Sequence, residues 1–142
     1  MTNPYEIRIA MVGSGGSGKS EILRRLQGQV FSPLYLPSND TTEWVIDLDE
    51  YRFMVTEYRG TTFYKAEDFA DVTAVIVVID GGSSLSRRYA RTLEKLLPHS
   101  IPMARMVNKS DISSLPITPE SCSAKKKTNL ETAFLSIAQT YA

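Results

Sequence analysis

Eight residues near the start of the chain, GSGGSGKS, have the types and the spacing of a loop that binds phosphate. Glycines let the backbone turn its N–H groups toward phosphate oxygens with no Cβ in the way. Lys19 can reach the β- and γ-phosphates as a point charge, and the Ser20 hydroxyl can ligate Mg²⁺. The predicted phosphate-binding residues are Gly13, Ser14, Gly15, Gly16, Ser17, Gly18, Lys19 and Ser20.

A second stretch, NKSD at residues 108–111, has the chemistry to select a base. The Asp111 carboxylate can accept hydrogen bonds from both the ring N1–H and the exocyclic amino group of guanine. Adenine lacks that pair of donors and would leave the carboxylate unpaired. Asn108 can bridge the base and the phosphate loop, and the aliphatic stem of Lys109 can lie over the ring. This tetrapeptide alone is common, so it needs support from the rest of the chain.

That support comes from a third stretch, Ser123, Ala124 and Lys125, which stands just before the last predicted helix. The backbone N–H of Ala124 can donate a hydrogen bond to the guanine carbonyl O6. The three stretches each follow or adjoin a predicted strand end, where an open α/β sheet binds its ligand. Together they predict a guanine nucleotide, GTP or GDP, bound with Mg²⁺.

The elements that must position these residues can be read from apolar patterns. We expect strands at residues 6–12, 43–48, 52–57 and 74–80, and a weaker one at 101–107 that Pro102 confines to its start. We expect helices at 19–29, 84–97 and 128–142. The second helix should turn Leu85, Tyr89, Leu93 and Leu96 or Leu97 inward, and the third should begin with Thr128 as its cap.

The connections between these elements predict the fold class. Strands two and three are joined by a short turn and should form an antiparallel edge hairpin. The remaining strands alternate with helices, which predicts a mostly parallel central sheet with helices on both faces. We therefore expect one α/β domain over residues 1–142.

Composition limits the kinds of partner. The chain carries 16 acidic and 16 basic side chains, a balance that argues against a nucleic-acid binder despite the local cluster at Lys125–Lys127. Its one cysteine, Cys122, suits a reducing compartment. The sequence shows no signal peptide, lipidation motif or long apolar run. We expect a cytoplasmic protein without a membrane anchor.

With these motifs in order, the chain resembles a Ras-like small GTPase over almost its whole length. The resemblance implies a P-loop G domain. Phe31 stands where the family places an aromatic ring against guanine, although it can instead pack in the core. Ser38, in the stretch YLPS, stands for the first-switch threonine that completes the Mg²⁺ shell, and Thr41 and Thr42 are rivals for that role.

The second switch departs from the family pattern. The family's motif begins Asp-x-x-Gly and usually continues with glutamine, whereas this chain has Glu57, Gly60 and then Thr61. Glu57 keeps a carboxylate for Mg²⁺ but is longer by one methylene, and the N–H of Gly60 can still sense the γ-phosphate. Thr61 is too short to orient the attacking water as glutamine does. The resemblance thus assigns catalysis to Lys19, Gly60 and Thr61, with slow intrinsic hydrolysis.

Two further interpretations remain open. The chain can be a scaffold that binds GTP without cycling or binds no nucleotide, as Glu57 and Thr61 favour. It can also be another phosphate-loop enzyme such as a nucleotide kinase, although it lacks an arginine-rich lid. In the switch interpretation an effector or regulator protein reads the switch segments. Trp44 is either an anchor for such a partner or an ordinary strand residue.

Overall fold

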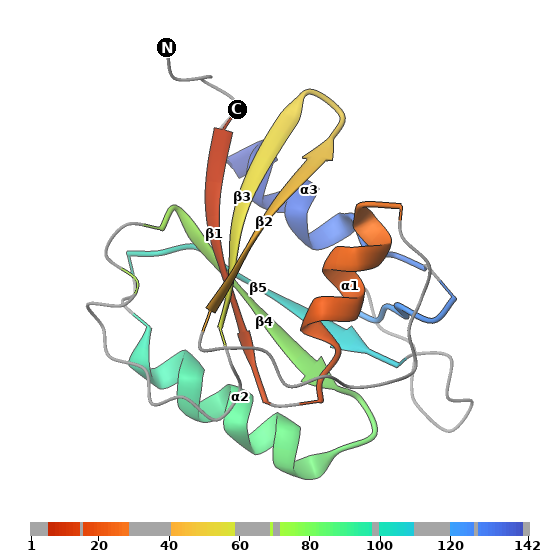
Figure 1. Ribbon diagram of the computed structural model, residues 1–142. Helices are drawn as coiled ribbons and strands as arrows, with labels where there is room; N and C mark the ends of the chain where they lie inside the picture. The colour runs from red at the N-terminus through yellow and green to blue at the C-terminus, as the bar shows by residue number, and fades with distance from the viewer. Residues whose placement is uncertain are drawn as a thin grey trace.

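In the described part of the chain, a computed structural model shows a five-stranded sheet in the order β2-β3-β1-β4-β5 (Figure 1). The structure describes residues 6–14, 16–28, 41–58, 69, 72–97, 100–109, 120–126 and 128–140. The strands are β1 (Glu6–Gly13), β2 (Thr41–Leu48), β3 (Tyr51–Tyr58), β4 (Ala74–Asp80) and β5 (Met103–Asn108). Only the β2–β3 pair is antiparallel, and the other neighbours are parallel. The expected fold class, an α/β sheet with one antiparallel edge hairpin, is confirmed.

Burial explains why the strands differ in composition. β4 is almost continuously apolar and buried because helices cover both of its faces. β2 alternates between exposed and more buried residues, as expected of an edge strand with one face on the core. The hairpin turn places Asp49 in the left-handed region, with φ 55°, and aspartate tolerates that conformation better than most residues.

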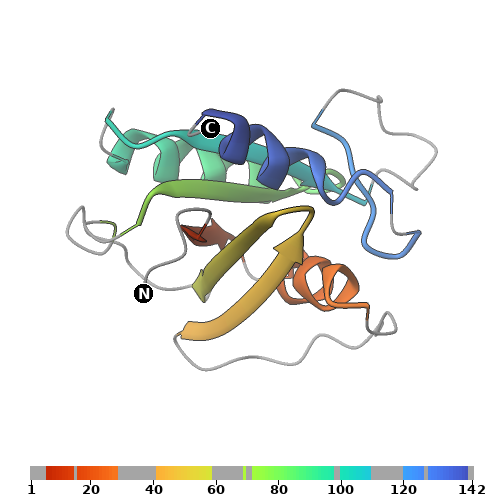
Figure 2. The ribbon, with the colours of Figure 1, turned by 90° about the horizontal axis from the view of Figure 1, so that it is seen from above.

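Three helices cover the sheet in the described part of the chain. α1 (Lys19–Leu26) and α3 (Thr132–Thr140) pack on one face, and α2 (Ser84–Leu96) packs on the other, as Figure 1 shows. The view from above places α1 beside the hairpin and α3 beside β5 (Figure 2). The larger of the two cores includes Phe53 of β3 and Phe134 of α3, whose rings meet edge to face with centroids 5.3 Å apart.

The helix predictions need three corrections. α1 ends at Leu26 rather than at residue 29. α3 begins at Thr132 because Thr128 exchanges two backbone hydrogen bonds with Ser123, so Thr128 is not a helix cap. The prediction that Leu85 points inward is wrong, because its side chain is 73% exposed in the first turn of α2.

None of the helices within the described ranges combines the length and the apolar character needed to cross a membrane.

Two substitutions on different helices test this assignment of the core. Phe134→Ala should lower the free energy of unfolding by roughly 3–5 kcal/mol, because it removes a fully buried ring. Leu85→Ala should change it by less than about 0.5 kcal/mol, since Leu85 is mostly exposed. Urea unfolding followed by circular dichroism measures both, and similar losses would contradict the assignment.

Candidate functional site

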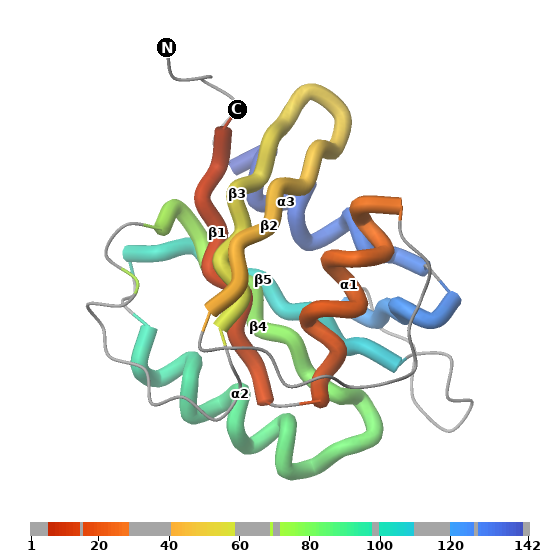
Figure 3. The backbone as a smooth tube through the Cα atoms, viewed as in Figure 1, coloured from red at the N-terminus to blue at the C-terminus, as the bar shows by residue number. Residues whose placement is uncertain are grey.

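The predicted site residues that the structure describes gather at one edge of the sheet, where the backbone trace brings strand ends together with the start of α1 (Figure 3). Gly13 ends β1, and Asp80 and Asn108 end β4 and β5 as paired residues. Glu57 lies one residue before the end of β3. Parallel strands place their carboxyl ends at the same edge, so chemistry from distant parts of the chain meets there. Six predicted site residues lie outside the described residues: Gly15, Phe31, Ser38, Gly60, Thr61 and Asp111.

Two glycines in the predicted phosphate loop are required by close contacts. Gly13 has φ 151°, and a Cβ there would lie 2.3 Å from the backbone oxygen of Val78. Gly18 has φ 99°, and a Cβ there would lie 2.1 Å from Nδ2 of Asn108. The loop is therefore pressed against β4 and against the end of β5. Ser14 adds a hydrogen bond from its hydroxyl to Oγ of Ser86 at 2.7 Å, which ties the loop to α2.

Lys19 is folded back over this loop. Its ammonium donates to the backbone oxygens of Gly13 at 3.0 Å and Ser14 at 2.9 Å, and its side chain is almost fully buried. Burial lowers the pKa of Lys19 from 10.5 to about 8, and the negative charge of Glu57 opposes part of that effect. A desolvated ammonium next to backbone N–H groups at a helix start is suited to an anionic ligand, which would supply the missing negative charge.

Asn108 joins the loop to the segment 120–126. Its Nδ2 donates to the backbone oxygen of Ser17 at 3.0 Å, and its Oδ1 accepts from the backbone N–H of Ala124 at 3.1 Å. The residue is 3% exposed, so both halves of its amide are used inside the protein. The N–H of Ala124, which the sequence assigned to a base carbonyl, thus has Asn108 as a partner and would be shared with any ligand.

Lys109 is held by an ion pair. Its ammonium lies 2.7 Å from Oδ2 of Asp80, the last residue of β4, and 3.4 Å from the backbone oxygen of Gly16. Its backbone has φ 68°, an unusual conformation for a lysine. These contacts hold the aliphatic stem of Lys109 beside the phosphate loop.

The segment that contains Ser123, Ala124 and Lys125 is also fixed from α1. Arg25 donates through Nε to the backbone oxygen of Ala124 at 3.0 Å, although the two residues are 99 positions apart in the sequence. The Ser123 hydroxyl accepts from the backbone N–H of Lys126 at 3.1 Å, and its side chain is buried. Lys125 is exposed. Two of the three predicted residues thus belong to a packed turn, and the third faces solvent.

A second cluster surrounds the Glu57 carboxylate, which is 4% exposed. One oxygen accepts a hydrogen bond from the Ser20 hydroxyl, and the other accepts from the indole Nε1 of Trp44 at 3.0 Å. Thr42 pairs with Glu57 across the β2–β3 ladder, and Thr41 pairs with Tyr58.

Ser20 and Glu57 fit the donor set of a magnesium ion. The Ser20 hydroxyl donates a hydrogen bond to the carboxylate, so a lone pair of its oxygen can face a cation. Among the described residues, no group of three or more His, Cys, Asp or Glu could hold a metal alone. Mg²⁺ beside phosphates typically needs only one or two protein oxygens, because phosphate and water supply the rest.

Three residues that the sequence did not assign to the site contribute to it: Arg25, Trp44 and Asp80. Asp80 gave the clearest signal, because it ends the most apolar strand and an open α/β sheet binds its ligand at strand ends. Its Oδ1 accepts from the backbone N–H of Gly82 at 2.9 Å, which shapes the turn after β4. Arg25 and Trp44 gave none, because their contacts depend on pairings that are distant in the sequence.

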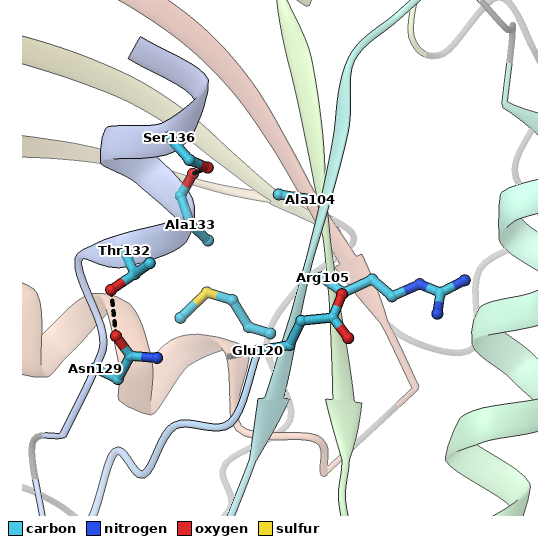
Figure 4. A pocket seen from close by; sticks show the side chains of 8 residues that line it. Ala104, Arg105, Glu120, Asn129, Thr132, Ala133 and Ser136 are labelled. Carbon is cyan, nitrogen blue, oxygen red and sulfur yellow. Dashed lines mark hydrogen bonds between the residues drawn. The ribbon is translucent and has the colours of Figure 1, made fainter. Parts of the chain in front are cut away.

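A separate pocket of about 190 Å³ lies between β5 and α3 (Figure 4). No predicted site residue lines it. Of its polar side chains, Asn129 donates to the backbone oxygen of Ser121 and accepts from the Thr132 hydroxyl. Asn129 and Thr132 thus shape the start of α3. The pocket is distinct from the candidate site because none of the predicted site residues lines it.

Comparison with models of known protein families and with curated proteins gives no match for this chain. The assignment of the site therefore depends on its own residues and geometry.

The contact between Gly18 and Asn108 can be tested with a matched pair of substitutions. Gly18→Ala should destabilise the protein by more than Gly16→Ala, because both residues have positive φ but only the Cβ at 18 meets Asn108. We expect a loss of roughly 1–2 kcal/mol for the backbone conformation alone at Gly16. Urea unfolding without nucleotide measures the difference, and equal losses would contradict the contact.

The lowered pKa of Lys19 predicts a pH dependence of stability. Between pH 8 and 10.5 the folded protein has already lost this proton while the unfolded chain still binds it, so stability rises with pH in that window. The free energy of unfolding of the native protein, relative to Lys19→Met, should increase by up to about 3 kcal/mol from pH 7 to pH 11.

Urea unfolding at several pH values measures this difference, because effects of other groups cancel between the two proteins. Substitution of the exposed Lys126 by Met is the control for removal of one positive charge. A pH-independent difference between the native protein and Lys19→Met would show that Lys19 is not desolvated in the folded state.

Proposed function

We propose that the chain is a guanine-nucleotide-binding switch protein with a P-loop G-domain fold, similar to the Ras-like small GTPases. It binds GTP and GDP with Mg²⁺ and hydrolyses GTP slowly. The observation that carries the proposal is the Asn108 side chain, which hydrogen-bonds to both the glycine-rich loop and the segment 120–126. The loop predicted to bind phosphate and the segment predicted to contact the base are thereby joined by one side chain.

Each residue has a role in this proposal. The loop N–H groups and Lys19 bind the phosphates, while Lys109 and Ala124 contact the base together with Asp111. Ser20 and Ser38 would hold Mg²⁺ together with the Glu57 carboxylate. Mg²⁺ would neutralise charge that develops on the transferred phosphate. The N–H of Gly60 would sense the γ-phosphate and order the second switch segment, which an effector protein reads.

Ligand binding requires one main rearrangement, in which the Lys19 ammonium turns from backbone oxygens of the loop to the phosphates. Its ammonium now donates to the backbone oxygens of Gly13 and Ser14. A phosphate would replace these neutral acceptors with anionic ones, which form stronger hydrogen bonds with an ammonium. Binding should therefore raise the pKa of Lys19 and keep it protonated at neutral pH.

The nucleotide that copurifies with the protein tests this proposal. After gentle purification and denaturation, anion-exchange chromatography should detect guanine nucleotide. Lys19→Met should carry at least tenfold less, because it removes the phosphate-binding charge. A matched Lys126→Met variant should carry as much as the native protein. Adenine nucleotide in the native protein would contradict the guanine assignment.

The rate of hydrolysis distinguishes the switch from the scaffold. Thr61 predicts slow intrinsic turnover, and the scaffold alternative predicts none. Single-turnover conversion of bound GTP measures the rate, and we expect it to be slower than in a family member that carries glutamine. Restoring that residue with Thr61→Gln should raise the rate. A native rate equal to that of a glutamine-bearing relative would contradict the prediction.

A further inference from the structure

Trp44 and Glu57 are neighbours across the β2–β3 ladder and lie on the same face of the sheet. Thr42 pairs with Glu57 and Trp44 pairs with Val55, so Trp44 is the diagonal neighbour of Glu57. Large side chains at such diagonal positions can reach each other. The indole Nε1 donates to Oε1 of Glu57 at 3.0 Å, while the rest of the ring packs against the larger core.

With this contact, both oxygens of the Glu57 carboxylate accept a hydrogen bond. Oε2 accepts from the Ser20 hydroxyl, and Oε1 accepts from Trp44. The indole N–H is a donor only, so it can hold a carboxylate oxygen but cannot compete with it for a cation. Glutamate is longer than aspartate by one methylene, which allows this one carboxylate to reach both α1 and β2.

We propose that Trp44 is a positioning residue that orients the Glu57 carboxylate toward Ser20 and the cation that Ser20 would hold. Trp44 and Glu57 act as a matched pair, in which the indole donor sets the direction of the longer carboxylate. This inference rests on the proposed nucleotide and Mg²⁺ site. It also changes the interpretation of Trp44, whose polar atom points into the protein rather than toward a partner.

Loss of the indole donor should weaken Mg²⁺ binding. Outer groups that orient metal-binding side chains typically contribute about 10- to 100-fold to metal affinity. In the GDP-bound protein, Trp44→Phe should raise the Mg²⁺ concentration for half-maximal thermal stabilisation roughly tenfold. Phenylalanine retains an aromatic ring but has no N–H donor.

A matched control separates positioning from packing. Ile46 lies on the same strand and the same face as Trp44 and is fully buried, with no polar contact to Glu57. Ile46→Val should lower stability by about 0.5–1.5 kcal/mol and leave the Mg²⁺ dependence unchanged. If both variants shift the Mg²⁺ dependence equally, the effect is one of packing and the proposal is wrong.

A double-mutant cycle tests whether Trp44 acts through Glu57. Glu57→Asp shortens the side chain, so that the carboxylate can no longer reach both partners. The effects of Trp44→Phe and Glu57→Asp on Mg²⁺ affinity should be less than additive, because each breaks the same contact. Full additivity would show that Trp44 does not act through Glu57.

The contact can also be observed directly. Trp44 is the only tryptophan in the chain, so an NMR spectrum of the ¹⁵N-labelled protein contains one indole N–H signal. In the native protein this proton should exchange slowly and shift downfield, and Glu57→Ala should reverse both effects. An unchanged signal in Glu57→Ala would overturn the proposal even if Trp44→Phe failed to fold.

GDP affinity at saturating Mg²⁺ separates this inference from the proposed function. If the native protein binds no guanine nucleotide, both are wrong. If it binds GDP and Trp44→Phe has the native Mg²⁺ dependence, the proposed function stands and the role of Trp44 is wrong.

Discussion

The amide of Asn108 is the interaction on which the rest of the site depends. It is buried, and it uses its donor for Ser17 in the loop and its acceptor for Ala124 in the later segment. Gly18 must lack a side chain for Asn108 to fit. Removal of the amide would leave the buried carbonyl of Ser17 and the buried N–H of Ala124 without this partner. An unpaired buried polar group costs more free energy than the hydrogen bond contributes to stability. One side chain thus links three segments that are distant in the sequence.

Two buried charged side chains, Lys19 and Glu57, lie at this edge of the sheet. Lys19 has a lowered pKa because burial is only partly offset by Glu57. Glu57 in turn requires hydrogen bonds from Ser20 and Trp44. Burying a charged side chain costs stability unless it is well paired and hydrogen-bonded, and residues with strongly perturbed pKa values cluster at functional sites. The apolar strands β1 and β4 beneath the site provide the stability that tolerates them.

Much of this arrangement follows from local sequence patterns. Apolar runs predicted β1 and β4, and the short turn between the second and third strands predicted the antiparallel hairpin. The predicted start of α3 was wrong because Thr128 and Ser123 exchange backbone hydrogen bonds. The local turn that these bonds form takes precedence over the capping pattern. The exposure of Leu85 was not predicted, because helical spacing alone does not show where the buried face of a helix begins and ends. The role of Trp44 depends on strand register, which no local pattern specifies.

Titration of nucleotide into nucleotide-free protein tests the central claim most directly, that Asn108 unites the loop and the segment 120–126 into one guanine-specific site. Calorimetry should detect GDP binding to the native protein in the presence of Mg²⁺, and ADP binding should be at least a hundredfold weaker. Asn108→Ala should lose tenfold or more of the GDP affinity while its circular dichroism stays native. Equal affinities for GDP and ADP, or undiminished GDP binding by a folded Asn108→Ala variant, would contradict the account.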